Sequence, residues 1–264
     1  MDTALQGKIA LVTGGGTGIG RGIALALAAE GVHVAIASRN PDPKTIEEIE
    51  SRGVRALRLC VDVSQEDQAI AMVRQTIQDL GGLDLYVNNA AAHWDEPATK
   101  LTTEGWMNSI HTNLSACVWA CREIARHFIA QGHGSILIIG SGAADNPLYK
   151  ETSYRVSKMG LKMYMEVLAI ELAPFGIRAN VIVPGYFRTK VASFIDPEME
   201  KSMLRTMPLR RAGNAEADIG PAAVLLLSDK LSPYTTGATW HVDGGARLRP
   251  LTFYSDEEIN QMSL

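Results

Sequence analysis

Residues 8–31 read KIALVTGGGTGIGRGIALALAAEG and place a run of glycines between two different patterns. The first part, 8–14, is almost continuously apolar and predicts a buried strand. The second part, 18–31, is rich in alanine and leucine and predicts a helix that ends at Gly31. Glycines at such a junction permit a tight turn and let the backbone approach a pyrophosphate at the helix N-terminus. The stretch therefore predicts a nucleotide-binding strand–turn–helix unit.

The same alternation continues along the chain. Apolar runs predict six further strands, at 32–38, 54–63, 83–89, 134–141, 177–185 and 237–245. Between them lie helical patterns at 43–53, from a capping box at 64–67 to Leu80, from about Thr102 to Ile129, and at 152–176. Strands that are apolar almost throughout and are separated by helices predict a parallel sheet covered on both faces. We predict a single α/β domain over 1–264, a Rossmann fold with a doubly wound seven-stranded sheet of order 3-2-1-4-5-6-7.

Composition excludes several classes of function. The chain has 264 residues, 25 basic and 29 acidic, and a net charge of −4, with no basic block that would indicate a nucleic-acid partner. No apolar run reaches the ~18 residues of a membrane span, and the N-terminus lacks the features of a signal peptide. Three cysteines without paired spacing predict buried thiols in a reducing compartment and no metal site. We therefore expect a cytoplasmic enzyme or binding protein, with most of the six histidines structural or on the surface.

Tyr154 and Lys158 lie four residues apart in the segment SYRVSKMG, 153–160. At helical pitch this spacing puts the phenol and the ammonium on one face, where they can share one small volume. A free tyrosine titrates near pH ~10, which is too high for an efficient general base. A neighbouring ammonium favours the phenolate, so we expect Lys158 to lower the pKa of Tyr154.

The end of the second predicted strand carries Ser38 and Arg39. Enzymes that use NAD usually have an acidic residue here, which accepts hydrogen bonds from the adenosine ribose. A small hydroxyl and a guanidinium instead suit a 2′-phosphate, because arginine presents a planar cationic fork. We therefore predict a preference for NADP(H), with NAD(H) as the alternative.

An ordered set of motifs from about Leu5 to Ala246 resembles the classical short-chain dehydrogenase/reductase family. Thr13–Gly20 reads TGGGTGIG, which fits the family pattern T-G-x-x-x-G-x-G. The segment VDV at 61–63 resembles its adenine-contacting pair, and NNAA at 88–91 its N-N-A-G, with Ala91 in place of glycine. Asn113 stands in HTNLSA, Ser141 lies thirteen residues before Tyr154, and VPGYFRT follows at 183–189. The resemblance implies cofactor contacts from Thr13, Gly14, Thr17, Gly18, Ile19, Gly20, Ser38, Arg39, Asp62, Val63, Asn89, Ala90, Tyr154, Lys158, Pro184, Gly185 and Thr189.

The resemblance also implies catalytic roles for Asn113, Ser141, Tyr154 and Lys158 in hydride transfer between a nicotinamide and a carbonyl or alcohol. Tyr154 would be the acid in reduction and the base in oxidation, and Ser141 would stabilise the substrate oxygen. Lys158 would hold the ribose, and Asn113 would kink its helix and support a water relay. The family also implies a homotetramer, with the helix at 152–176 in one interface.

Three substrate classes remain open at this point: a ketone or secondary alcohol in general, a 3-oxoacyl thioester, and a sugar, polyol or cyclic alcohol. A non-catalytic NADP-binding sensor is a rival from another class. Trp94, Asp95 and Tyr149 are expected near the substrate, and 186–211 is expected to form a lid in which Phe194, Met199, Met203 and Met207 either line the site or pack. The extension at about 247–264, with Leu251, Phe253 and Tyr254, either packs at a subunit interface or frays.

Overall fold

The structure is a computed structural model that describes residues 2–189 and 195–248. Phe194 and most of the C-terminal extension, with Leu251, Phe253 and Tyr254, lie outside the described residues. The strands are β1 Ile9–Thr13, β2 His33–Ser38, β3 Ala56–Cys60, β4 Leu85–Asn88, β5 Gly134–Ile139, β6 Ile177–Pro184 and β7 Thr239–Val242. They form one parallel sheet of order β3-β2-β1-β4-β5-β6-β7, which confirms the predicted topology.

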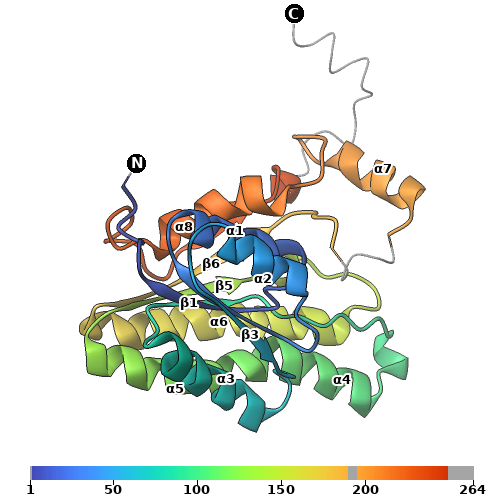
Figure 1. The fold of residues 1–264 in the computed structure, drawn as a ribbon. Helices are drawn as coiled ribbons and strands as arrows, with labels where there is room; N and C mark the ends of the chain where they lie inside the picture. Colours follow the sequence, from blue (N-terminus) through green and yellow to red (C-terminus); the bar gives the residue numbers. More distant parts are fainter. Residues whose placement is uncertain (1, 190–194, 249–264) are drawn as a thin grey trace, which may run out of the picture.

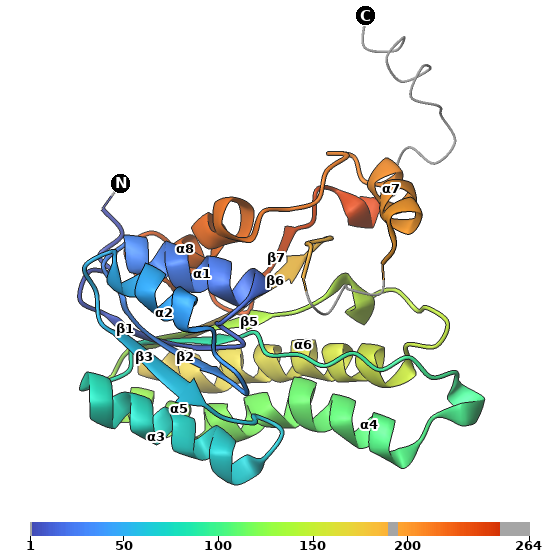
Figure 2. The ribbon, with the colours of Figure 1, turned by 45° about the vertical axis from the view of Figure 1, so that its right-hand side comes forward.

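Helices cover both faces of this sheet (Figures 1 and 2). On one face lie α1 Gly18–Ala29, α2 Pro43–Glu50 and α8 Gly220–Leu227, and on the other lie α3 Glu66–Leu80, α4 Thr103–Ile110, α5 Ala116–Gln131 and α6 Thr152–Leu172. Side chains of consecutive strand residues point to opposite faces of the sheet. Leu11 packs in the hydrophobic core between the sheet and α3, α5 and α6, and Val12 packs in the core between the sheet and α1 and α8. Because both faces of the sheet are buried, the strands are apolar at nearly every residue and do not alternate between apolar and polar residues.

Two helical predictions need correction. The capping box at 64–67 does not form, because the Ser64 hydroxyl donates to Asp62, at 2.8 Å, and α3 begins after Gln65 without a side-chain cap. The helix predicted from Thr102 to Ile129 is interrupted by a π-helical turn, His111–Ser115, between α4 and α5. This turn contains Asn113 and is the local distortion that the family resemblance implied.

The helix after Asp196 forms as its sequence predicts. This helix, α7 Pro197–Thr206, follows Asp196, whose carboxylate accepts a hydrogen bond from the Met199 backbone N–H at 2.8 Å. In both views α7 stands apart from the layer formed by α1, α2 and α8 (Figures 1 and 2).

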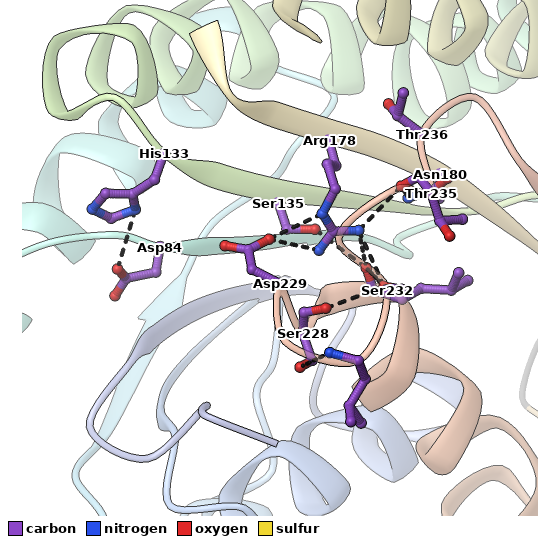
Figure 3. A network of polar contacts seen from close by, with 12 residues as sticks. Asp84, His133, Ser135, Arg178, Asn180, Ser228, Asp229, Ser232, Thr235 and Thr236 are labelled. Carbon is purple, nitrogen blue, oxygen red and sulfur yellow. Dashed lines mark hydrogen bonds and ion pairs between the residues drawn. The ribbon is translucent and has the colours of Figure 1, made fainter. Parts of the chain in front are cut away.

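A buried arginine fastens β6 to the segment that follows α8 (Figure 3). The Arg178 guanidinium donates to the Leu226 carbonyl oxygen at 2.7 Å, to the Thr235 carbonyl oxygen at 3.2 Å and to the Asp229 carboxylate at 2.8 Å. Ser232 accepts a further bond at 3.3 Å. These bonds hold the loop before β7 at the amino ends of β6 and β7, the end of the sheet opposite the site described below.

Candidate active site at the carboxyl ends of the strands

The glycine-rich turn after β1 has no room for a side chain at Gly14 or at Gly20. Gly14 has a φ of +64° and Gly18 a φ of +55°, both in the left-handed region that favours glycine. A Cβ on Gly14 would lie 2.7 Å from the Asn89 side-chain nitrogen, and one on Gly20 would lie 2.4 Å from the Gly14 carbonyl oxygen. At these glycines the backbone can approach a phosphate at the N-terminus of α1 with no side chain between them.

Thr13 braces this turn against the end of β4. Its hydroxyl oxygen accepts hydrogen bonds from the backbone N–H groups of Asn89, at 3.0 Å, and Ala90, at 3.1 Å. The Asn89 side chain in turn donates to the Thr13 carbonyl oxygen at 2.9 Å. Strands β1 and β4 are neighbours on either side of the topological switch point, where doubly wound sheets bind their ligands.

A cavity of about 920 Å³ opens at this point. Its lining includes these sequence-predicted residues: Gly14, Thr17, Gly18, Ile19, Asn89, Ala90, Ser141, Tyr154, Lys158, Pro184, Gly185 and Thr189. The remaining predicted residues, all of them among those that the structure describes, lie off this cavity: Thr13, Gly20, Ser38, Arg39, Asp62, Val63 and Asn113. Thr13 and Gly20 shape the turn from behind, and Asn113 lies buried in the π-helical turn.

Lys158 is buried at the floor of the cavity. Its ammonium nitrogen donates to the Ile139 carbonyl oxygen at 3.2 Å and lies 5.8 Å from the centre of the Tyr154 ring. Burial lowers the pKa of Lys158 from its ordinary 10.5 to about 8. The two side chains project from one face of α6, as their spacing predicts.

The structure does not show the expected lowering of the Tyr154 pKa. Burial raises the pKa of Tyr154, and a side-chain hydrogen bond with Ser141 opposes that rise without cancelling it. Desolvation is the largest cause of the raised pKa; the Glu151 carboxylate adds to the rise and the Arg155 guanidinium opposes it. Tyr154 is a neutral phenol, suited to donating a proton.

Asn113 joins three segments around this cluster. Its side-chain nitrogen donates to the Ala92 carbonyl oxygen and to the Ser157 hydroxyl, both at 2.9 Å, and its oxygen accepts from the Ala92 N–H at 2.7 Å. Since Asn113 is fully buried, its side chain positions the loop after β4 against α6.

Ser38 ends β2 beside Gly16 of the glycine turn, and Arg39 follows it; both lie off the cavity. Arg39 is exposed, and among the described residues its side chain makes no hydrogen bond or ion pair, so the guanidinium can reach an incoming anion. The Asp62 carboxylate accepts hydrogen bonds from the backbone N–H and hydroxyl of Ser64, at 3.0 and 2.8 Å.

The residues around the substrate end differ from the expected ones. Trp94 packs against Gly105 of α4 and Tyr149 is 76 % exposed, and neither lines the cavity. Their places are taken by His93, Glu151 and Arg155, which the sequence analysis did not select. The spacing of Glu151, three residues before Tyr154, is a helical signal that could have indicated it. His93 has no such signal, because it lies in an irregular loop.

Met203 and Met207 line the cavity, whereas Met199 on the same segment is 45 % exposed. Lining therefore holds for both methionines, and packing holds as well for Met207, which is 6 % exposed.

Among the described residues, no helix combines the length and apolar character needed to cross a membrane.

Comparison with known proteins places this geometry in a family. A sequence profile of the family described as Enoyl-(Acyl carrier protein) reductase matches residues 14–247. The 3-oxoacyl-[acyl-carrier-protein] reductase FabG of Staphylococcus aureus is 34 % identical over 243 residues, covering 90 % of this chain and 97 % of that protein.

Solved structures agree with this comparison. A candidate short-chain alcohol dehydrogenase of Sinorhizobium meliloti superposes with a TM-score of 0.89 at 36 % identity, over 94 % of this chain and 99 % of that one. A candidate 2-deoxy-D-gluconate 3-dehydrogenase of Agrobacterium tumefaciens, solved with bound NADP, gives 0.85 at 32 % identity, over 94 % and 99 % of the two chains. The chain belongs to the classical short-chain dehydrogenase/reductase family of oxidoreductases, which act on alcohol or carbonyl groups.

Proposed function

We propose that this protein interconverts a ketone and a secondary alcohol by hydride transfer with NADP(H). The observation that carries the proposal is the position of Ser141, Tyr154 and Lys158 on the same cavity as the glycine turn. A dinucleotide bound with its pyrophosphate at that turn would extend toward these three side chains. A sensor without catalysis would not need them, so the enzyme is the better-supported function.

The residues fit the roles that the reaction needs. In reduction, Tyr154 would donate its phenolic proton to the carbonyl oxygen, and NADPH, when bound, would supply the hydride that the carbonyl carbon accepts. Ser141 donates a hydrogen bond to the same oxygen and stabilises the charge that develops there. Lys158 holds the ribose hydroxyls and favours the phenolate once the proton has left. Asn113 supports the water relay toward Lys158 by fixing the π-helical turn.

The cofactor site fits NADP(H) better than NAD(H). No acidic residue ends β2, and Arg39 is exposed there with Ser38 beside it. A 2′-phosphate would pair with the guanidinium, whereas NADH has no charged group to offer it. Similar solved structures include two with bound NADP and one with bound NAD+, so the preference rests on Ser38 and Arg39. Thr17, Gly18 and Ile19 would hold the pyrophosphate, and Pro184, Gly185 and Thr189 the nicotinamide end.

The enzyme is also proposed to be a cytoplasmic homotetramer. One face of α6 exposes apolar side chains at helical spacing, and their exposed fractions range from 39 to 77 %: Val156, Met159, Met163, Val167 and Ile170. An exposed apolar stripe along a 21-residue helix is typical of an interface between protein chains. A second copy, with its own α6, would cover the stripe.

Binding and turnover test the function separately. Titration with NADPH and with NADH, followed by nicotinamide fluorescence, should show tighter binding of NADPH. A screen of ketones with the preferred cofactor should then show oxidation of NADPH, monitored by absorbance. Cofactor binding without any turnover of ketones, acyl thioesters or sugars would support the non-catalytic sensor instead. Equal affinity for NADPH and NADH would show that Arg39 does not recognise the 2′-phosphate.

A further inference from the structure

The wall of the cavity beside Tyr154 carries a charged cluster to which the proposed reaction gives no role. His93, Glu151 and Arg155 line the cavity, and their side chains are only 13 %, 13 % and 16 % exposed. Asp95 lies behind them and is 45 % exposed. The His93 and Tyr154 rings pack edge to face, with centroids 4.8 Å apart and an interplanar angle of 63°. A charge on His93 therefore acts at short range on the phenol that exchanges the proton.

Both ring nitrogens of His93 face a carboxylate. Nε2 lies 3.7 Å from the Glu151 carboxylate, and Nδ1 lies 3.4 Å from that of Asp95. A neutral imidazole carries an N–H on one nitrogen and a lone pair on the other, so it would turn a lone pair toward one of these carboxylates. The imidazolium carries an N–H on both nitrogens. The geometry therefore suits the charged form of His93.

The surrounding charges act in the same direction. The hydrogen bond to Glu151 raises the pKa of His93, burial opposes that rise, Asp95 adds to it and the Arg155 guanidinium opposes it, and the result lies above the ordinary 6.5. Burial raises the pKa of Glu151, but His93 and Arg155 together outweigh it, so that pKa lies below its ordinary value. The carboxylate that His93 faces is therefore charged near neutral pH.

The state of His93 sets the net charge beside Tyr154. Two carboxylates and one guanidinium leave the cluster with a net negative charge when His93 is neutral, and with none when His93 is an imidazolium. The Lys158 ammonium lies 5.8 Å from the centre of the Tyr154 ring. A negative cluster opposes that ammonium, whereas a neutral cluster leaves it unopposed. Lys162 is paired with Asp145 at 2.7 Å and does not change this balance.

This balance matters because Tyr154 must lose its proton before it can accept one from an alcohol. The Glu151 carboxylate raises the pKa of Tyr154, in addition to the larger effect of burial, and the Arg155 guanidinium lowers it. An opposite charge within about 4–6 Å of an ionised group lowers its pKa by ~1–3 units. An imidazolium at the position of His93 therefore offsets the carboxylate.

A metal ion explains the cluster less well. Ligand atoms of His93, Asp95 and Glu151 lie within 4.8 Å of one another. However, the two carboxylates face different nitrogens of the ring and do not converge on one ion. Arg155 also places a guanidinium on Glu151 at 2.8 Å, which a metal would have to displace.

We propose that His93 assists proton transfer by Tyr154 as an imidazolium that offsets the Glu151 carboxylate. With this carboxylate offset, the Lys158 ammonium stabilises the phenolate unopposed. The effect belongs to the acid side of the activity profile, because His93 is charged there and loses its charge as the pH rises. His93 acts through Tyr154 and is a positioning residue. This inference rests on the proposed function.

The charge on His93 can be measured without turnover. Proton–nitrogen NMR of the histidine rings reports whether each ring nitrogen carries a proton, and the His93→Gln spectrum assigns the His93 signals. Both nitrogens should be protonated at pH 6, and the ring should titrate above its ordinary pKa of 6.5. A ring that carries only one proton at pH 6 would overturn the inference.

The effect on proton transfer is measured in the direction of oxidation. The kcat/KM for cyclohexanol and for 1-phenylethanol with NADP⁺ should rise with pH as Tyr154 loses its proton. His93→Gln keeps a polar side chain that cannot be charged, and it should move the midpoint of that rise upward by about one pH unit, a tenfold change on the acid side. The readout is the midpoint and not the height of the plateau, so weaker substrate binding does not imitate it.

A second substitution distinguishes charge from structure. His93→Gln combined with Glu151→Gln removes the imidazolium together with the carboxylate that it offsets, so the midpoint should return close to the wild-type value. If His93 only supported the loop, the second change would add to the defect. Thermal unfolding of each variant shows whether it is folded.

A matched control exists elsewhere in the chain. His133 also lies 3.7 Å from a carboxylate, that of Asp84, but it precedes β5, at the end of the sheet away from the cavity (Figure 3). His133→Gln should therefore leave the midpoint unchanged.

The outcomes distinguish the two proposals. No turnover of any alcohol or ketone with either cofactor would overturn the proposed function and this inference with it. Turnover with a midpoint that His93→Gln does not move, or that the double variant does not restore, would overturn only the inference. Loss of activity in EDTA that added Zn²⁺ or Mg²⁺ restores would show a metal site and would also overturn it.

Discussion

The ammonium nitrogen of Lys158 lies 5.8 Å from the centre of the Tyr154 ring, one helical turn along α6; Lys158 is buried and Tyr154 is half-buried. Burial pushes both groups toward their neutral forms, so it lowers the pKa of Lys158 to about 8 and raises that of Tyr154. Burying the Lys158 ammonium is therefore unfavourable, and the ribose hydroxyls of a dinucleotide, as hydrogen-bond acceptors, would reduce that cost.

Lys158→Met should stabilise the cofactor-free protein while abolishing most activity. Below pH 8 the lysine is protonated in both states, and the folded protein bears the full penalty of burying the charge. Between pH 8 and 10.5 the folded lysine is neutral while the unfolded one still binds a proton, so wild-type stability rises with pH. The variant should gain about 1–3 kcal/mol of unfolding free energy at pH 7, with the gain fading toward pH 10.5. Denaturant unfolding at both pH values measures this, and a gain that does not change with pH would contradict it.

Tyr154→Phe should remove turnover and keep cofactor binding. The change deletes only the hydroxyl that donates the proton, so kcat should fall by about 10³-fold or more. NADPH affinity, measured by fluorescence titration, should stay within a few-fold of the wild type. Tyr149→Phe is the matched control, because Tyr149 is exposed and does not line the cavity. Comparable turnover in Tyr154→Phe would assign the proton transfer to another group.

Arg39→Ala should change the cofactor preference without changing the chemistry. A charge-assisted hydrogen bond to a 2′-phosphate contributes about 1.5–3 kcal/mol, so NADPH affinity should fall by about 10- to 100-fold. NADH affinity should not change, since NADH lacks the phosphate. Arg58→Ala, a change on the neighbouring strand β3, serves as a charge-matched control. An equal loss for both cofactors would mean that Arg39 supports the fold of the loop instead.

Much of the fold could be predicted from local patterns. Strands such as β1 are buried at every residue, and that burial requires the continuous apolar runs that the sequence shows. The Asp196 cap and the glycine turn also depend on neighbouring residues alone, so they too were predictable. The capping box at Ser64 failed because Asp62, two residues earlier, competes for the same hydroxyl.

The substrate end of the site depends on contacts that no local pattern contains. Tyr154 and Lys158 were predicted as neighbours from their spacing, but the direction of the Tyr154 pKa depends on burial by other segments. In the irregular loop after β4, Trp94 turns to Gly105 of α4 while the adjacent His93 turns to Tyr154. Without a repeating period, adjacent residues in such a loop cannot be assigned to the inside or outside.

The exposed stripe on α6 should hold the subunits together. Met163 is 58 % exposed and Ile170 is 77 % exposed in the single chain, and a glutamate at either position would place a charge in an apolar interface. Met163→Glu with Ile170→Glu should shift the protein from tetramer to smaller species in sedimentation velocity at matched concentrations. Met199→Glu, at an exposed methionine on α7, should not. An unchanged sedimentation coefficient in the double variant would place the interface elsewhere.

Arg178 and its partner Asp229 should differ sharply in their effect on stability. The Arg178 side chain is 8 % exposed and donates to buried carbonyl groups, whereas Asp229 is 62 % exposed and can be rehydrated. Arg178→Met leaves the Leu226 and Thr235 carbonyl groups with fewer donors and should lower the unfolding free energy by about 2–3 kcal/mol. Asp229→Asn should lower it by less than about 1 kcal/mol, because an exposed ion pair contributes little. Denaturant unfolding of the two variants measures this difference. Both are measured at the same protein concentration, because subunit association also contributes to the apparent stability. Equal losses would mean that the ion pair, and not the bonds to backbone, holds β6 to the loop before β7.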